Sequence, residues 1–135
     1  MDGAGIAAAL NLGAVAAQLG TAFIACPESA ADEGYRTALR GPGAYHTTLT
    51  SLISGRPARA LANRFTALSD QLGGRLPPDY PIAYDAGKIL HTRARAKGDD
   101  GFGAQWAGQG APLIREMPAA QLVQILRKEL QTSLA

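Results

Sequence analysis

The sequence predicts an α/β protein in which helices outnumber strands, and three patterns support this class. Residues 5–12 have the apolar spacing of a helix and are followed by Gly13, a typical helix terminator. Residues 15–19 form an uncharged, mostly apolar run, as expected of a parallel strand covered by helices on both faces. Later segments have the periodicity of amphipathic helices. A helix, a glycine and a buried strand form half of a βαβ unit, so the neighbouring strands are expected on another stretch of chain.

Four further helices are predicted from apolar spacing and end signals: 29–39, 61–72, 85–97 and 118–130. The first would open with a capping box formed by Ser29 and Asp32. Residues 45–53 (YHTTLTSLI) are rich in threonine and β-branched residues and could form a strand or lead into a loop. Residues 75–85 contain several prolines and are expected to form a surface connection.

Composition limits the classes of function. A chain of 135 residues with a net charge of +2 has the size of one domain and too little positive charge to indicate nucleic-acid binding. The single cysteine, Cys26, indicates a reducing, cytoplasmic setting. Residues 3–27 are uncharged, but no cation precedes Arg36 and four glycines interrupt the run. Neither an export signal nor a membrane span is therefore expected.

Residues 18–21, Gln-Leu-Gly-Thr, form the clearest candidate for a binding site. Gly20 and Thr21 follow the predicted strand, so that a backbone N–H and a hydroxyl would lie at its carboxyl end, where α/β enzymes bind phosphate groups. The glycine would let the backbone approach a ligand closely. The alternative is the ordinary start of a loop.

Arginines concentrate in residues 54–65, where Arg56, Arg59 and Arg64 have no acidic residue nearby in the sequence. Their guanidinium groups could bind a phosphate or a carboxylate in bidentate fashion. Alternatively, they lie on a solvated helix face and donate to backbone carbonyls.

The segment WAGQG places Trp106, Gln109 and Gly110 in a loop that could contact a planar ligand through its amide groups. The alternative is a tryptophan that fills a gap in the core. His46 and His91 have no carboxylate or cysteine partner at the spacing of a metal site or a catalytic triad. Neither histidine is predicted to be catalytic, and no metal site is expected.

Three segments together resemble the carboxyl-terminal part of the nitronate monooxygenases, also called 2-nitropropane dioxygenases. In order along the chain they are MDGAGIAAALNLGAVAAQLGTAFIACPES, SGRPARALANRF and WAGQG, followed by an amphipathic tail. The resemblance implies a carboxyl-terminal fragment of a flavin-binding (β/α)8 TIM barrel with a lid segment, mostly helical as it stands. A complete barrel of this kind needs about 250 residues. One departure is Ala60, which stands where the family usually has a glycine after GRPAR.

The resemblance also implies a division of the chain into three parts. Residues 1–26 would be the last helix and strand of the barrel, and residues 27–84 would belong to the lid or substrate domain. Residues 85–135 would be carboxyl-terminal helices that pack on the barrel.

The same resemblance assigns the cofactor-binding residues. Gly20 and Thr21 match the Gly-Thr pair that holds the FMN phosphate in the family, and Gln109 and Gly110 match a loop near the flavin. The family's catalytic histidine belongs to a part of the enzyme upstream of these residues, and neither His46 nor His91 matches its motif. No catalytic residue is therefore assigned within this chain.

The implied function is that of an FMN-dependent nitronate monooxygenase, which oxidises alkyl nitronates with O2 to a carbonyl compound and nitrite. The isolated chain is expected to be inactive. Expected partners are a small nitroalkane or nitronate, O2, and either a complementary upstream chain or further copies of this chain. Two alternatives stay open: another FMN barrel oxidoreductase resembling an enoyl reductase, and a non-catalytic helical module that binds a partner through its leucine-rich faces.

Overall fold

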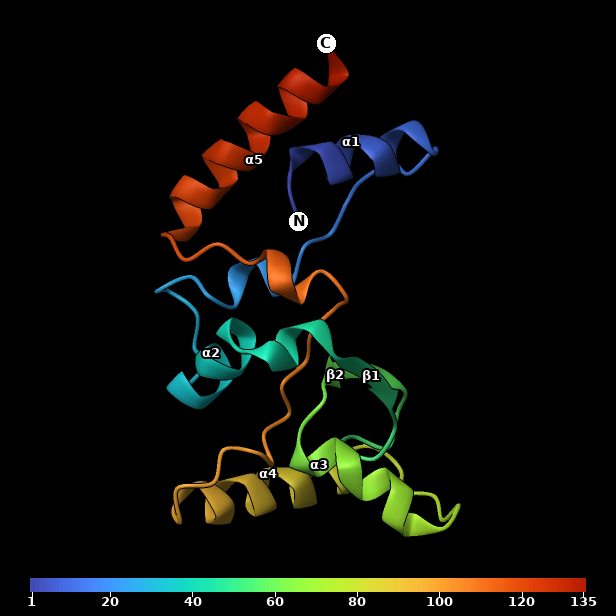
Figure 1. The fold of residues 1–135 in the computed structure, drawn as a ribbon. Coiled ribbons are helices and arrows are strands. Elements are labelled where there is room, and N and C mark those ends of the chain that lie inside the picture. Colours follow the sequence, from blue (N-terminus) through green and yellow to red (C-terminus); the bar gives the residue numbers. More distant parts are fainter. The chain divides into compact units, whose positions relative to one another are not determined.

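The computed structural model describes residues 1–135, which form two compact units. The first unit combines the two ends of the chain, residues 1–31 and 113–135, and the second is the continuous stretch 32–112. In Figure 1 the first unit has the dark blue and red colours of the chain ends, and the second runs from cyan to orange. The predicted division into residues 1–26, 27–84 and 85–135 refers to parts of a complete barrel enzyme. It stays a prediction.

The first unit is built on two helices, α1 (Gly3–Asn11) and α5 (Ala119–Leu134), with the short 3-10 helix η1 (Thr21–Phe23) between them in sequence. The Asp2 side chain caps α1 by accepting a hydrogen bond from the Gly5 N–H at 2.9 Å. The start of α5 directly after Pro118 agrees with the predicted helix start. The core of this unit is formed by apolar residues of η1, of the turn after it and of α5: Ala22, Cys26, Leu122 and Leu126.

The prediction of a buried strand at residues 15–19 is wrong for this structure. Residues 14–19 form an irregular connection, and Val15 is fully exposed. A strand requires a neighbouring strand that accepts and donates its backbone hydrogen bonds. Strand pairing in this chain is confined to a two-stranded sheet elsewhere, so the apolar run has no partner with which to form a strand.

The second unit begins with α2 (Glu33–Arg40), and its helix cap differs from the prediction. Asp32, not Ser29, is the N-cap: its carboxylate accepts a hydrogen bond from the Tyr35 N–H at 2.8 Å. The Ser29 hydroxyl instead accepts from the N–H of Ala31, two residues on. The helix therefore starts four residues later than predicted.

A β-hairpin follows α2 and the short 3-10 helix η2 (Pro42–Tyr45). Strands β1 (Thr47–Thr50) and β2 (Ala58–Leu61) pair antiparallel, with Thr47 opposite Leu61. The strand that YHTTLTSLI could form is thus present as β1. The other side of β2 is bridged at Ala60 by Trp106, which brings the WAGQG segment against the hairpin.

The helix predicted over residues 61–72 is shorter than expected. Leu61 ends β2, and the helical part consists of α3 (Arg64–Ala67) and the 3-10 helix η3 (Leu68–Leu72). Asn63 and Thr66 form the capping box that starts α3. Gly73 ends the segment in the left-handed conformation, with φ of 55°.

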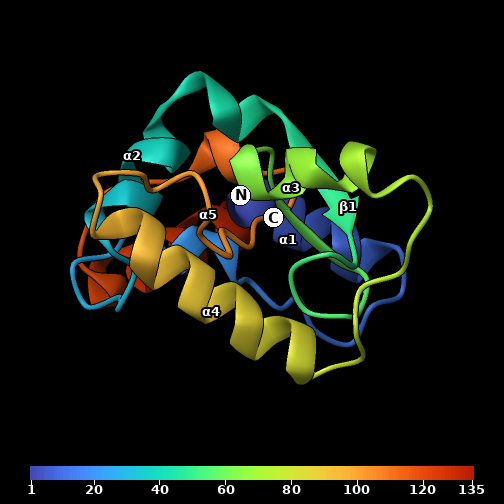
Figure 2. The same ribbon diagram turned by 90° about the horizontal axis from the view of Figure 1, so that it is seen from below.

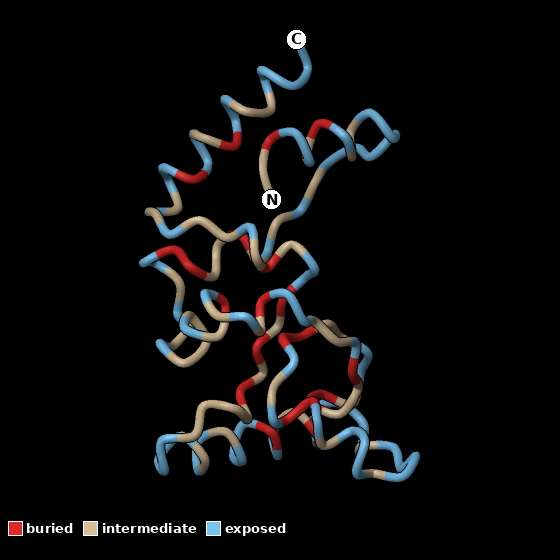
Figure 3. The backbone as a smooth tube through the Cα atoms, in the orientation of Figure 1, coloured by how far each residue is buried: buried red, intermediate tan, exposed pale blue.

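Helix α4 (Ile82–Arg95) starts three residues before the predicted 85–97 helix, and its full length is visible in Figure 2. It buries only the small residues Ala83 and Gly87, and Gly87 lies against Phe65 and the backbone of Ile53. One core cluster of this unit consists of Ile53, Ala60 and Phe65, and Leu39 and Leu61 are also buried in the unit. Figure 3 shows that buried positions are interspersed with long exposed stretches in both units. None of the helices combines the length and the apolar character that a membrane crossing requires.

Candidate functional site

The Gly20-Thr21 pair lies in the first unit, where it starts η1 rather than ending a strand. Gly20 is exposed, and a side chain added there would meet no atom within 4 Å. The carbonyls of Gly20 and Thr21 accept the N–H groups of Phe23 and Ile24, which closes the 3-10 turn. The backbone at Gly20 is therefore open to a ligand, as the phosphate hypothesis requires.

A cavity of about 320 Å³ adjoins this turn. One of its walls is Glu28, whose two carboxylate oxygens lie 3.0 and 3.1 Å from the N–H of Ala119 and accept its hydrogen. The partial positive charge at the start of α5 thus already faces an acidic side chain. The lining residues are Gly20, Phe23, Ile24, Glu28, Ser29 and Ala119.

A second polar contact of the first unit joins α5 to the start of α1. Arg115 donates to both carboxylate oxygens of Glu129, at 2.7 and 3.2 Å. One of these oxygens also accepts the Gly3 N–H at 2.9 Å. The hydrogen bonds from Arg115 and from Gly3 lower the pKa of Glu129, so the carboxylate stays ionised and holds the two helix ends together.

The predicted pair Gln109-Gly110 lies in the second unit, in a turn closed by the Ala111 N–H and the Gly108 carbonyl. Gln109 is exposed, and the turn follows directly on the segment that pairs with β2. The two predicted pairs therefore belong to different units. Gln109 and Gly110 lie in a turn, as expected of a loop, whereas Gly20 and Thr21 start a 3-10 helix instead of following a strand.

The second unit gathers aromatic rings and cations, of which the sequence patterns had indicated only Arg56 and Trp106. Tyr80 and Tyr84 stack with ring centroids 6.2 Å apart, and the Tyr84 ring lies 6.5 Å from that of Trp106. The Lys88 ammonium lies 4.4 Å above the centre of the Tyr84 ring, and the Arg56 guanidinium lies 4.9 Å from that of Tyr80. We call these five residues the aromatic-cation cluster. Its two cations could attract a small anion, and its rings offer flat apolar surfaces beside those charges.

The three arginines of residues 54–65 all have partners within the second unit. Arg59 donates to the carbonyl and hydroxyl oxygens of Thr47 in the hairpin, and Arg64 forms an ion pair with Asp99. Only Arg56 belongs to the aromatic-cation cluster. The alternative role of carbonyl donor is correct for Arg59, while a ligand contact stays a prediction for Arg56.

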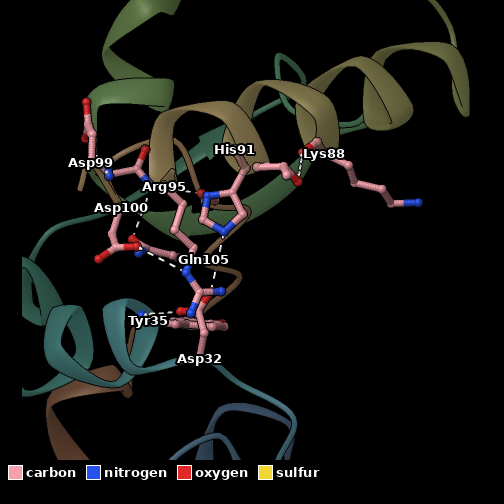
Figure 4. Close-up of polar contacts among 12 residues, drawn as sticks. Asp32, Tyr35, Lys88, His91, Arg95, Asp99, Asp100 and Gln105 are labelled. Carbon is pink, nitrogen blue, oxygen red and sulfur yellow. Dashed lines mark hydrogen bonds and ion pairs between the residues drawn. The ribbon is translucent and has the colours of Figure 1, made fainter. Parts of the chain in front are cut away.

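A polar network links α2 to α4 through Asp32 (Figure 4). Oδ2 of this carboxylate lies 3.4 Å from Nε2 of His91 and 3.1 Å from a terminal nitrogen of Arg95. Partial burial alone would raise the pKa of Asp32, but the N–H of Tyr35, His91 and the positive charge of Arg95 outweigh burial and lower it. The carboxylate is therefore held in its ionised form.

Tyr35 adds a further connection in the same unit. Its hydroxyl donates to the carbonyl oxygen of Trp106, and burial raises the pKa of this phenol. Tyr35 is therefore a neutral donor at physiological pH, and it holds the backbone of the tryptophan whose ring packs on Tyr84.

We expect the free energy of unfolding to fall as the pH is lowered from about 5 through the lowered pKa of Asp32. The folded state holds this carboxylate ionised more strongly than the unfolded chain does, so its stabilising contribution is present above the unfolded pKa and is lost in acid. Urea unfolding monitored by Trp106 fluorescence at several pH values measures this. The variant Asp32→Asn cannot titrate there and should show a shallower pH dependence; an equal slope would contradict the assignment.

Comparison with known proteins identifies the family. The model of the family described as nitronate monooxygenase matches residues 1–129. The chain belongs to this family. It is 61% identical over 134 residues to a nitronate monooxygenase of Paraburkholderia phytofirmans and 56% identical over 131 residues to one of Pseudomonas aeruginosa. These matches cover 99% and 97% of the chain but only 37% of each relative, so the chain spans less than half of their length.

Solved structures agree with this membership in an oxidoreductase family. A nitroalkane oxidase from Streptomyces ansochromogenes is 44% identical, with a TM-score of 0.87 over 99% of this chain and 38% of its own. FabK from Thermotoga maritima is 31% identical, with a TM-score of 0.73 over 98% of this chain and 42% of its own. The resemblance to nitronate monooxygenases is thus confirmed.

Sequence reasoning missed several residues of this member of the nitronate monooxygenase family. Tyr84 and Lys88 are four residues apart, which is a usable signal for one face of a helix, whereas Tyr80 precedes α4 and had no such signal. The partnership of Asp32 with His91 had no such signal, because 59 positions separate the two residues.

Proposed function

We propose that this chain supplies part of an FMN-dependent nitronate monooxygenase, which oxidises alkyl nitronates with O2 to a carbonyl compound and nitrite. The observation that carries the proposal is the family match over residues 1–129. The likeness to a solved nitroalkane oxidase supports a nitro compound as the substrate class. In the proposed complete enzyme, these residues would form the carboxyl-terminal part of a TIM barrel.

The first unit offers groups that fit the phosphate of FMN. Gly20 has an open backbone, and the hydroxyl of Thr21 lies next to it in the chain. Glu28 lines the adjoining cavity, and its negative charge would oppose a phosphate placed there, so the phosphate would bind on the Gly20 side, away from the Glu28 oxygens that accept the Ala119 N–H. In the proposal Gly20 and Thr21 hold the phosphate, and Gln109 and Gly110 contribute amide groups near the flavin. The bound flavin would supply the redox chemistry.

The aromatic-cation cluster fits the other reactant, because a nitronate is a small planar anion. The ammonium of Lys88 would attract its negative charge, and the rings of Tyr80 and Tyr84 would exclude water from one side of it. Asp85 lies 3.2 Å from the Lys88 nitrogen and forms an ion pair with it that leaves the ammonium accessible, since both side chains are more than half exposed. These residues bind and orient the substrate. No group of the cluster is assigned the proton abstraction.

A chimera tests the proposed function directly. Residues 1–135 would replace the matched 134-residue segment of the Paraburkholderia phytofirmans nitronate monooxygenase, which supplies the remaining part of that protein. We expect the purified chimera to hold FMN and to release nitrite from an alkyl nitronate in the presence of O2. The unmodified relative is the positive control, and the relative without the segment is the negative control.

Three results would overturn the proposal. The first is a folded, flavin-loaded chimera that releases no nitrite. The second is reduction of an acyl substrate that depends on NAD(P)H, which would favour the enoyl reductase-like alternative. The third is a stable, defined oligomer of the 135-residue chain with a chimera unable to hold flavin, which would favour the helical interaction module.

A further inference from the structure

Helix α4 carries four functional side chains at intervals that place them on one side of the helix. Tyr84, Lys88, His91 and Arg95 are spaced four, three and four residues apart, so they follow one another along one face over three turns. The first two belong to the aromatic-cation cluster. The last two contact the same oxygen of Asp32.

The apolar packing of α4 lies in its first half. Ala83 and Gly87 are buried there, and Tyr84 packs against the core of the second unit. In the second half Ile89 and Leu90 are exposed, so polar contacts are what hold this part of the helix to the rest of the unit. Asp32 supplies two of them from outside the helix, while Nδ1 of His91 is buried and has no hydrogen-bond partner.

Asp32 is itself held in place by α2. Its second oxygen, Oδ1, accepts the Tyr35 N–H at 2.8 Å as the N-cap, so the carboxylate bridges the start of α2 and the last two turns of α4 (Figure 4). Arg95 also lies 3.8 Å from Asp100, a longer contact than its 3.1 Å contact with Asp32. The Asp32 side chain thus connects the last two turns of α4 to the start of α2.

We propose that Asp32 is a positioning residue for substrate binding: by holding His91 and Arg95, it sets the orientation in which α4 presents Lys88 and Tyr84. The role of Lys88 and Tyr84 in substrate binding rests on the proposed function. The role of Asp32 in orienting α4 does not depend on it. A rotation of α4 would move Tyr84, Lys88, His91 and Arg95 together, because all four lie on one rigid helix. Loss of the Asp32 charge should therefore disturb the aromatic-cation cluster, whose members on α4 lie about one to three turns away.

The substitution Asp32→Asn separates positioning from helix capping. Asparagine is as good an N-cap as aspartate, so the start of α2 and Tyr35 should stay in place. The charge that holds Arg95 and His91 is lost. The matched control is Glu33→Gln, which removes the adjacent acid and its exposed ion pair with Arg40 without touching α4.

Trp106 provides a readout that does not depend on activity, because it is the only tryptophan and its ring packs on Tyr84. In the 135-residue chain we expect Asp32→Asn to raise the acrylamide quenching constant of Trp106 about twofold, as a partly covered ring becomes accessible. Glu33→Gln should leave it unchanged. If Asp32→Asn fails to fold, Arg95→Gln removes the same contact from an exposed position and should raise the quenching constant in the same direction.

In the chimera we expect Asp32→Asn to lower kcat/KM for a nitronate about tenfold, mostly through a higher KM, because a misplaced binding group weakens substrate orientation. Glu33→Gln should leave both constants near those of the parent chimera. Unchanged quenching and unchanged KM in Asp32→Asn would overturn the positioning role. A parent chimera without nitrite release would overturn the proposed function instead, and the Trp106 measurement would still decide whether Asp32 orients α4.

Discussion

Replacing Gly3 with alanine is expected to separate α1 from α5 and to lower the free energy of unfolding by about 3 kcal/mol. A Cβ at this position would overlap the backbone nitrogen of Leu130 and the carbonyl carbon of Glu129. Both neighbours are backbone atoms of α5, so neither can move aside without displacing the helix. The change would also strain the hydrogen bond from the Gly3 N–H to Glu129. Urea unfolding monitored by far-ultraviolet circular dichroism measures the effect.

The control for this variant is Gly5→Ala, the same substitution one half-turn further along α1. There the added methyl group meets only the side chain of Asp2, at 3.3 Å. Alanine favours a helix over glycine, so the expected change in stability lies within about 1 kcal/mol of zero. If the two variants lowered the free energy of unfolding equally, the close approach of α5 to Gly3 would not be the cause of the destabilisation.

Replacing Lys88 with methionine in the chimera is expected to lower kcat/KM for an alkyl nitronate about 30-fold, because the loss of a charge-assisted contact is worth about 2 kcal/mol. Methionine keeps most of the length and apolar stem of lysine, so packing on Tyr84 should be preserved. Steady-state nitrite release at several nitronate concentrations separates KM from kcat, and the loss should appear mainly in KM.

The matched control is Lys97→Met, which removes an exposed lysine beyond the end of α4 and outside the aromatic-cation cluster. It lowers the net charge by the same amount as Lys88→Met but should leave the kinetics unchanged. If both variants lose activity equally, the long-range charge of the protein, rather than the position of Lys88, governs nitronate binding.

Helices whose signals are local could be predicted from the sequence. Residues 118–130 combine a proline at the start with an apolar face, and the structure has α5 there with Leu122 and Leu126 buried. Gly13 and Gly73 end their helices with positive φ, as glycine permits. In these cases the information lies within a few residues of the element, so the pattern and the structure agree.

Elements that depend on distant partners could not be predicted in the same way. The run at 15–19 has the composition of a buried strand, but composition does not show whether a neighbouring strand is present. Likewise, Leu61 fits the spacing of a helix, yet its N–H donates to the carbonyl of Gln105, which places it in the hairpin layer. Pairing across more than 40 positions overrode the local periodicity.

The candidate site shows the same limit. The sequence predicted that a ligand could approach the backbone at Gly20 closely, and the backbone there is open. That this ligand is the FMN phosphate stays a prediction. The aromatic-cation cluster combines Arg56 from the hairpin loop, residues of α4 and its approach, and Trp106, and no sequence motif connects these three segments. Lys88 became a candidate only when the fold placed it over an aromatic ring.

The first unit joins the two ends of the chain, and this has a consequence for the order of events during protein synthesis. Residues 32–112 leave the ribosome as one continuous stretch that already contains the second unit. By contrast, α1 is translated before the second unit and must wait until α5 has been translated before Gly3 can contact Glu129 and Leu130. Contacts of such long sequence separation form slowly. The face of α1 that packs on α5 is therefore exposed to chaperones and proteases while residues 12–118 are translated, whereas the second unit can complete its core before α5 exists.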